Sequence, residues 1–493
     1  MRHPLRKLAG LTVGALTTSL LIAGPAFAGK AVAEGKPEAA TATSLNLLWI
    51  IIGATLVIFM QAGFALVETG LCRAKHAAHV VSTNFAIFGL GFVGFFIIGF
   101  PLMFGGYSYP GYFGMDTAIG SNLIGSGDWV FLWKGPLALS GKGYDVAVVA
   151  FFLYMVAFMD TTATIPTGSM AERWKWKSFV AWGLFCGSIY YPIFGAWTWG
   201  GGWLSQLGDS LKLGHGYVDF AGSGVVHAVG GMAALAGSIV LGPRIGKYGP
   251  DGKARPMPGH HLPMAMLGTF ILLFGWFGFN AASTFSATDN RFTLAAVNTA
   301  IAAAFGAVAA MYLVSYTGAK KPEPAAMING MLAGLVAITA PCAFVAPWAA
   351  AVIGVTAAVL VTYAGRFIEA RGIDDPVGAI AVHGVGGLYG VICVGLFSDG
   401  TYGAAWNALG RQWTKDNNVT GLFYGGEGAK QLLAQLIGCG VLVTAIFGMA
   451  FAFFTIQNKL TKGGIRSSEA DELEGLDMPE MGTHAYPDFA LVK

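Results

Sequence analysis

The sequence is poor in charge. Only 11% of its 493 residues are Asp, Glu, Lys or Arg, whereas 55% are hydrophobic. A soluble domain carries about 25% charged residues, so this chain cannot cover a water-exposed surface and is predicted to be a membrane protein in contact with a lipid bilayer. The net charge of +3 comes from Lys and Arg in loops, and no nucleic acid is expected as a partner.

Cysteine is scarce as well, with five residues in the chain. They lie mostly in or beside apolar runs at no metal-ligand spacing, so they are interpreted as small core residues and no disulfide framework is expected. Glycine, in contrast, is abundant at 72 residues. Small residues let membrane helices approach closely, and this abundance therefore indicates tightly packed spanning helices.

The N-terminus is typical of a secretory signal. Arg2, Arg6 and Lys7 precede an apolar stretch that ends in the cleavage-like Ala26-Phe27-Ala28. The alternative is a retained first span, for which the apolar part is short. We therefore expect a signal peptide over residues 1–28 and a short periplasmic segment over 29–44, with the mature N-terminus outside the cytoplasm.

Eleven apolar runs of about 20 residues, the length that crosses a bilayer, lie between residues 45 and 457. They fall near 45–70, 84–106, 146–170, 177–200, 217–242, 261–284, 291–316, 325–344, 346–366, 377–398 and 432–457. An odd number of spans places the C-terminus in the cytoplasm, and Lys and Arg gather in the loops that this topology makes cytoplasmic. The prediction is an all-α polytopic protein of the inner (plasma) membrane. Its polar tail, residues 458–493, is either disordered or a docking surface.

Two nearly identical runs each place one histidine in an apolar setting, at Val225–Gly231 (VVHAVGG) and Ala381–Gly387 (AVHGVGG). They fall on the fifth and tenth predicted spans, which run in opposite directions, and a half-length inverted repeat is typical of transporters. At about 1.5 Å per residue, His227 lies about 12 Å and His383 about 10 Å into the membrane from opposite sides. The hydrocarbon half-thickness is about 15 Å, so the two histidines are expected to meet near its middle.

An ionisable residue at the middle of the membrane is a candidate functional site. A core histidine bonded to a backbone carbonyl is the competing interpretation, and it suits one histidine better than two at matched depth. No Cys, Asp or Glu stands within either run to complete a ligand set, so no metal site is predicted. A neutral imidazole pair suits either a small polar solute or a proton relay, and the sequence leaves both open.

The fifth span begins at Asp219. This residue is a helix N-cap, a negative charge that draws in a cation, or both. Asp219, Ser223 and His227 share one helix face, which is a pattern that also suggests a hydrolase. A hydrolase needs an oxyanion hole, and the amides of a regular helix are already bonded, so no enzyme is predicted.

Four residues are expected near the same outer depth as Asp219: Phe158, Trp199, Phe279 and Ser283. Aromatic residues at this depth commonly form the interfacial belt of a membrane protein. Their common depth favours the alternative, which is a cage that holds a small cation by cation–π attraction.

Five stretches carry a resemblance to a known family: GFALVETG, MDTTATIPTGSMAERW, DFAGSGVVH, GWFGFNAAS and DDPVGAIAVHGVGG. With them the chain resembles the ammonium transporter (Amt/Mep/Rh) family from about residue 44 to 487. The resemblance implies eleven transmembrane helices, arranged as two inverted five-helix repeats plus a C-terminal helix. It also implies a homotrimer with one pore in each subunit.

The resemblance further assigns roles to the residues above. It implies an outer ammonium site made of Phe158, Trp199 and Ser283 with Asp219 below it, stacked phenyl gates at Phe158 and Phe279, and a twin-histidine pore of His227 and His383. Many relatives carry Phe-Gln where this chain has Tyr154 and Met155, a difference that changes the polarity of the outer vestibule.

The expected function is ammonium transport without a cofactor. Ammonium is recruited outside, loses its proton below the gate and crosses as ammonia, while the proton travels along the histidines or by another route. The alternative is an ammonium sensor that signals through the cytoplasmic tail. In relatives that tail binds a PII-type regulator, which is the protein partner that the resemblance suggests.

Six further ionisable residues receive no transport role. Four histidines near cytoplasmic loops are expected to be solvated: His76, His79, His260 and His261. Glu68 and Asp160 fall within predicted spans, where they are expected to make interhelical or intersubunit hydrogen bonds.

Overall fold

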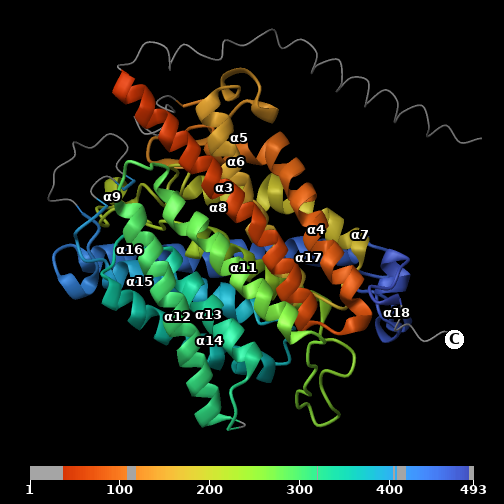
Figure 1. The fold of residues 1–493 in the computed structure, drawn as a ribbon. Helices are drawn as coiled ribbons and strands as arrows, with labels where there is room; N and C mark the ends of the chain where they lie inside the picture. Colours follow the sequence, from red (N-terminus) through yellow and green to blue (C-terminus); the bar gives the residue numbers. More distant parts are fainter. Residues whose placement is uncertain (1–36, 108–117, 319, 404–405, 408–417, 488–493) are drawn as a thin grey trace, which may run out of the picture.

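The structure is a computed structural model that describes residues 37–107, 118–318, 320–403, 406–407 and 418–487. The predicted signal peptide lies outside these residues. The described chain is a bundle of long helices (Figure 1). Ten of them are long and apolar enough to cross a membrane. The eighth expected span forms a shorter apolar helix of 16 residues, Pro324–Thr339.

The helices are, in chain order, α3 (Pro37–Leu71), α4 (Ala77–Gly94), α5 (Phe100–Phe104), α6 (Val146–Ser169), α7 (Trp176–Phe185), α8 (Tyr191–Trp197), α9 (Leu207–Ser210), α10 (Val229–Leu241), α11 (Leu262–Asn280), α12 (Arg291–Thr317), α13 (Pro324–Thr339), α14 (Pro347–Ala370), α15 (Gly386–Phe397), α16 (Gly428–Val441), α17 (Phe447–Leu460) and α18 (Glu469–Glu474). Three π-helical segments make single spans of neighbouring helices: η2 (Phe95–Gly99), η5 (Cys186–Tyr190) and η10 (Leu442–Ile446). The first span reaches further toward the N-terminus than expected, because α3 begins at Pro37.

A β-hairpin, which the sequence did not predict, lies in the first long loop. Strand β1 (Ser121–Ser126) pairs antiparallel with β2 (Trp129–Lys134) across the two-residue turn Gly127-Asp128. Gly127 has a φ of +54°, which is the left-handed backbone that tight hairpin turns require. The hairpin packs against α5 and α8.

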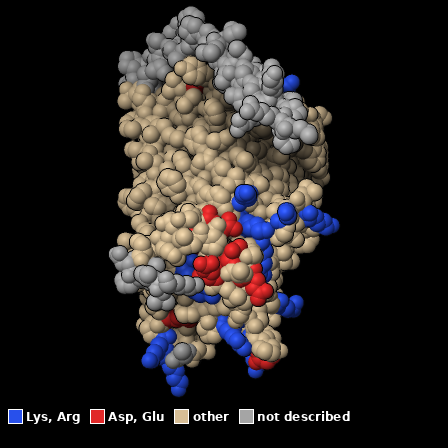
Figure 2. All heavy atoms as spheres, turned by 90° about the vertical axis from the view of Figure 1, so that its right-hand side faces the viewer, with Lys and Arg blue, Asp and Glu red and all other residues tan. Residues whose placement is uncertain are grey.

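The surface has a charged end and an apolar band. Figure 2 shows one face on which Lys, Arg, Asp and Glu gather in the lower part, while the part above is almost uncharged. Large apolar side chains project from the helices, and Phe85 is 84% exposed and Phe270 59% exposed. Surfaces of this kind are contact surfaces for lipid or protein, as expected of a chain that spans a membrane.

The loops after α3, α6, α10 and α14 meet at one end of the bundle, which we call the basic end. It carries Arg73, Glu172, Arg173, Arg244 and Asp374, which are joined by hydrogen bonds. The opposite end is called the far end.

The C-terminal tail is folded against the basic end (Figure 1). Helix α18 is capped by the Ser468 hydroxyl, which accepts from the amide of Asp471. The Glu472 side chain is 1% exposed, bonds Arg466 at 2.7 Å and accepts from the Ile245 amide at 2.7 Å. The described part of the tail is therefore ordered against the helices, whereas its use as a docking surface stays a prediction.

This docked tail corrects the expectation that His76 and His79 are solvated. His76 is 0% exposed and His79 is 2% exposed. The Leu476 amide donates to His76 Nδ1 at 3.2 Å, and the His79 amide donates to Asp477 at 3.1 Å. The tail covers the start of α4. The position of these histidines beside a loop in the sequence does not reveal this contact.

Candidate pore and substrate site

The two histidine-bearing spans pack against each other in opposite directions. Gly224 approaches Val391, whereas Gly231, further along its helix, approaches Gly384, which comes earlier in the other helix. Residue numbers therefore rise along one helix as they fall along the other. A Cβ atom on Gly231 would overlap the backbone of Gly384, so glycine at this position permits the close approach.

Each of these spans begins with an aspartate eight positions before its histidine. The Asp219 carboxylate accepts from the successive amides of Gly222–Val225 at 2.7 to 3.0 Å. The Asp375 carboxylate accepts from Ala379 at 2.9 Å and Ile380 at 2.7 Å. Burial raises the pKa of Asp375 to about 6, although these amide hydrogen bonds act in the other direction. Both aspartates thus cap the first amides of these helices with their side chains, from positions that precede the N-cap residues Gly222 and Ala379.

Each capping aspartate is followed, at the same spacing along the chain, by a glycine with positive φ. Gly222 has a φ of 116° and Gly378 a φ of 82°, a backbone conformation that costs glycine little and other residues much. The shared spacing of Asp, Gly and His in the two spans is a repeat signal in the sequence. Comparing the two seven-residue histidine runs alone does not reveal it.

The histidines lie in π-helical turns that the sequence did not predict. These turns are η6 (Ser223–Ala228) and η8 (Ile380–Val385). The His227 amide donates to the carbonyl of Gly222, five positions back, at 3.0 Å. Such turns are frequent at functional sites.

The predicted contact between the two histidines is confirmed. His227 Nδ1 and His383 Nδ1 are 3.1 Å apart, and the residues are 0% and 5% exposed. Only one of the facing nitrogens carries a hydrogen in this bond, so the other accepts and its neutral ring carries hydrogen on Nε2. Two imidazolium rings this close in a buried site repel each other, and the pair therefore holds at most one positive charge.

Two stacked phenyl rings lie on the His227 side of the pair. Phe158 of α6 and Phe279 of α11 have ring centroids 4.0 Å apart, and the Phe279 centroid is 5.4 Å from that of His227. Both phenylalanines are 0% exposed, so His227 is covered by buried rings on this side. Trp276 also stacks on His227 at 5.0 Å, a contact that the sequence did not predict.

Trp199, a member of the expected aromatic cage, packs against the phenyl pair. The Trp199 ring is T-shaped against Phe158, with centroids 5.8 Å apart. Its Nε1 donates to the backbone carbonyl of Asp219 at 2.7 Å, so the turn that caps the histidine helix also orients the indole.

Ser283, the fourth residue of this group, stands in the short helix η7 (Ala281–Thr284) after α11. Its hydroxyl donates to the carbonyl of Phe279 at 2.7 Å and lies 3.1 Å from the hydroxyl of Tyr154. Tyr154 in turn donates to the carbonyl of Gly278 at 2.8 Å. The departure from the family pattern at Tyr154 thus places a second hydroxyl beside Ser283.

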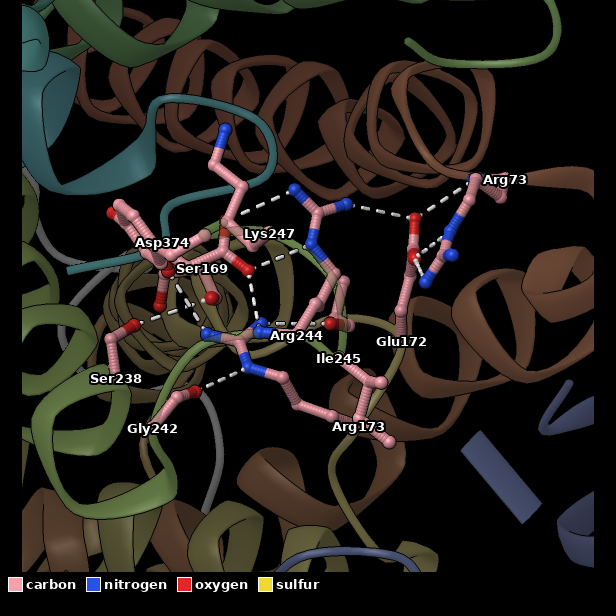
Figure 3. Close-up of polar contacts among 12 residues, drawn as sticks. Arg73, Ser169, Glu172, Arg173, Ser238, Gly242, Arg244, Ile245, Lys247 and Asp374 are labelled. Atoms are coloured by element: carbon pink, nitrogen blue, oxygen red, sulfur yellow. Dashed lines mark hydrogen bonds and ion pairs between the residues drawn. The ribbon is translucent and has the colours of Figure 1, made fainter. Parts of the chain in front are cut away.

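At the basic end a buried ionic network joins the loops (Figure 3). Arg244 donates to Asp374 at 2.8 Å and to Glu172 at 3.0 Å. Arg73 donates to Glu172 at 2.6 Å, and Arg173 donates to the backbone carbonyl of Asp374 at 2.9 Å. Asp374, which directly precedes the capping Asp375, is therefore joined through this network to the loops after α3, α6 and α10.

Opposite charges hold these carboxylates ionised. Burial acts to raise the pKa of Asp374, but Arg244 and Arg173 outweigh it and bring the pKa to about 2. For Glu172, Arg244, His76 and Arg73 likewise outweigh burial, and its pKa is below the usual range.

Two facing imidazoles lie in an antiparallel pair of capped helices, beside stacked phenyl rings. A helical membrane protein with this arrangement belongs to the class of membrane transporters for small polar solutes. A family model described as the Ammonium Transporter Family matches residues 48–486. The chain belongs to this family: it is a multi-pass membrane protein of ammonium transport and not an enzyme. The match confirms the family that the sequence motifs indicated.

Relatives of known name and structure agree. The chain is 45% identical to ammonium transporter Amt2 of Archaeoglobus fulgidus over 447 residues, which covers 90% of this chain and 89% of the relative. Among solved structures, it is similar to a sensor Amt protein, with a TM-score of 0.75 and 34% identity over 90% of this chain and 99% of that one. Mep2 of Candida albicans has a TM-score of 0.71 and 27% identity, over 90% of this chain and 91% of Mep2.

Proposed function

We propose that this transporter binds ammonium at the far end, removes its proton and conducts ammonia along His227 and His383. The observation that carries the proposal is the buried path, in which stacked phenyl rings 4.0 Å apart precede two buried imidazoles. A charge at the centre of a membrane costs about 2.5 kcal/mol or more. Ammonia avoids that cost, whereas an ammonium ion at this depth would meet apolar walls.

The recruitment site in this proposal consists of Phe158, Trp199, Ser283 and Asp219. The two aromatic rings offer their faces to a small cation, and the Ser283 hydroxyl offers an acceptor lone pair. Asp219 caps the helix and orients Trp199 through its carbonyl. In the proposal its carboxylate also adds negative charge near the mouth.

The proton follows its own route in this mechanism, along the histidine pair. A proton that arrives on one ring can leave from the other, because the rings share a single hydrogen bond of 3.1 Å. Net transport is then electrogenic, since each ammonia is accompanied by one positive charge. Phe158 and Phe279 act as the gate that separates ammonium from this path.

In the membrane, we place the basic end in the cytoplasm and the N-terminus outside, after cleavage of a signal peptide over residues 1–28. The positive-inside rule supports this orientation. We also propose two inverted five-helix repeats and a homotrimer with exposed apolar helix faces between subunits. The docked tail is the surface that a cytoplasmic PII-type regulator would contact.

Current and uptake in reconstituted vesicles test the function. Ammonium should drive both, and replacement of both His227 and His383 by leucine should abolish ammonium flux. Uptake without any current at every ammonium concentration would refute the proton route. Unchanged flux in the double variant would show that the histidines are structural.

An ammonium sensor remains the second candidate. The similarity to a sensor Amt protein and the docked tail favour it. Uptake of methylammonium by cells that lack other ammonium transporters distinguishes the two, because a sensor that does not conduct leaves uptake at the background of those cells.

A further inference from the structure

A small cavity lies against His383 and holds an ionisable group that the mechanism above does not use. Its volume is about 20 Å³, enough for one water molecule, which needs roughly 10–15 Å³. His383 lines it and His227 does not. Its wall is otherwise mostly apolar, with Phe64 among the lining side chains, but it also includes Glu68 and Asn329.

The carboxyl group of Glu68 is buried among neutral partners. Glu68 is 3% exposed. Its Oε2 accepts from Asn84 Nδ2 at 2.7 Å, and both of its oxygens lie 2.9 Å from the Thr167 hydroxyl. Within the described residues no Lys, Arg or His forms an ion pair with it. A buried carboxyl without a cationic partner can exchange a proton without breaking an ion pair.

Asn329 supplies an unused acceptor in the same cavity. Its Oδ1 is buried and has no hydrogen-bond partner among the described residues. Buried polar atoms of proteins are almost always bonded. The open acceptor therefore suits a donor that visits the cavity, such as water or ammonium.

The position of Glu68 along α3 places it one step beyond the histidines. Phe64 packs its ring 6.2 Å from the ring of His383. Glu68 follows Phe64 by four positions, which is one helical turn and about 6 Å along the axis. That turn leads toward Leu71, where α3 ends beside Arg73 at the basic end.

We propose that Glu68 is the inner proton-exchange group of this transporter, and this inference rests on the proposed passage of ammonia and proton along the histidines. The N–H bond of protonated His383 breaks, and its proton passes through the cavity water to a Glu68 carboxylate oxygen, forming a carboxylic acid. The acid then gives that proton to the lone pair of an ammonia molecule, which leaves as ammonium. Asn329 Oδ1 accepts an N–H bond of the new ammonium.

A structural role is the competing explanation, because Glu68 joins α3 to Asn84 on α4 and Thr167 on α6. Glu68→Gln separates the two roles. The amide has the same shape and still accepts hydrogen bonds, but it cannot take up a proton. The matched control is Asp160→Asn, which neutralises another buried acid, 2% exposed, that does not line the cavity.

The experiment measures ammonium-driven current on supported membranes and ammonia entry, as ammonium nitrogen accumulated in the vesicle lumen, for the three proteins. Glu68→Gln should lower the current at least about tenfold, in line with the loss of a general acid–base group, and should leave ammonia entry in place. Asp160→Asn should keep both. Equal currents in wild type and Glu68→Gln would overturn the role of Glu68 alone, as would an equal loss in Asp160→Asn. A wild type without current would overturn the proton route and this inference together.

Infrared difference spectroscopy of the wild type keeps the inference testable if Glu68→Gln does not fold. Exchange of potassium for ammonium should change the C=O stretch of a carboxylic acid, because a buried carboxyl gains or loses a proton during transport. A spectrum with no carboxylic-acid band would overturn the inference.

Discussion

Two neighbouring glycines of the histidine helices give opposite expectations for the same substitution. A Cβ at Gly231 would overlap the backbone nitrogen and Cα of Gly384. A Cβ at Gly384 would meet its nearest neighbour, Met232 Cε, at 3.5 Å, an ordinary contact. Gly231→Ala and Gly384→Ala therefore change the same interface by one methyl group each, and only the first forces the helices apart.

The magnitude follows from the contact distances. To restore an ordinary carbon–carbon contact, the Gly231→Ala backbones must separate by on the order of 1 Å. The histidine nitrogens are 3.1 Å apart, and a hydrogen bond is lost beyond about 3.5 Å. Overpacking costs about 1–3 kcal/mol. The gain in helix propensity, about 1 kcal/mol, is common to both variants.

Thermal unfolding in detergent and ammonium flux in vesicles check this expectation. Gly231→Ala should unfold at a lower temperature than Gly384→Ala and should lose most of its flux, whereas Gly384→Ala should retain wild-type flux. If Gly231→Ala equals Gly384→Ala in both measurements, the reasoning that glycine sets the spacing of the histidine pair is wrong.

Four further predictions concern the basic end and the recruitment site. Glu172→Gln removes the carboxylate that Arg73 and Arg244 share and should cost about 3 kcal/mol, the lower end for a broken buried ion pair, because Arg244 keeps Asp374; this is seen as a lower unfolding temperature. The control is Glu369, which is 46% exposed and paired with Lys247, and Glu369→Gln should cost less than about 1 kcal/mol. Because the pKa of Asp374 is about 2, the stabilisation that its carboxylate provides is complete above the ordinary pKa of an aspartate and is lost as pH falls through about 2. Asp374→Asn should therefore lower the unfolding temperature equally at about pH 5 and about pH 8. A smaller effect at the lower pH would contradict this. Glu472→Gln should release the tail and speed proteolysis after Lys459, and an unchanged digestion rate would show that other contacts hold the tail. Trp199→Leu should weaken discrimination against potassium in flux assays, and full potassium exclusion would count against the cage.

The sequence predicted those parts of the molecule that depend on local pattern and repetition. Apolar run lengths located the spans, and matching depth brought His227 to His383. The position of the tail could not be predicted, because composition indicates whether a segment is exposed to water but not which surface it packs against. Glu472 finds its amide partner at Ile245, 227 positions earlier.

The candidate site was predicted by residue type more completely than by geometry. The aromatic residues and Ser283 were expected together, but the hydroxyl pair of Ser283 and Tyr154 depends on how α11 ends. The π-helical turns follow the Asp–Gly caps without any periodicity signal in the sequence. Glu68 was seen as an intramembrane acid, and only the cavity that it shares with His383 indicates a use for it.

The antiparallel arrangement of the two capped histidine helices has a consequence for the direction of transport. A helix dipole is positive at the N-terminus, and these two helices begin at opposite mouths, each beneath its own aspartate. Side by side, their fields cancel along the pore. The passage therefore has no built-in polarity at its centre, and the gradients of ammonium and voltage set which way net flow runs. In the proposed mechanism, any asymmetry between uptake and release must come from the groups on the two sides of the histidine pair, which are aromatic rings and hydroxyls on one side and a carboxyl and an amide on the other.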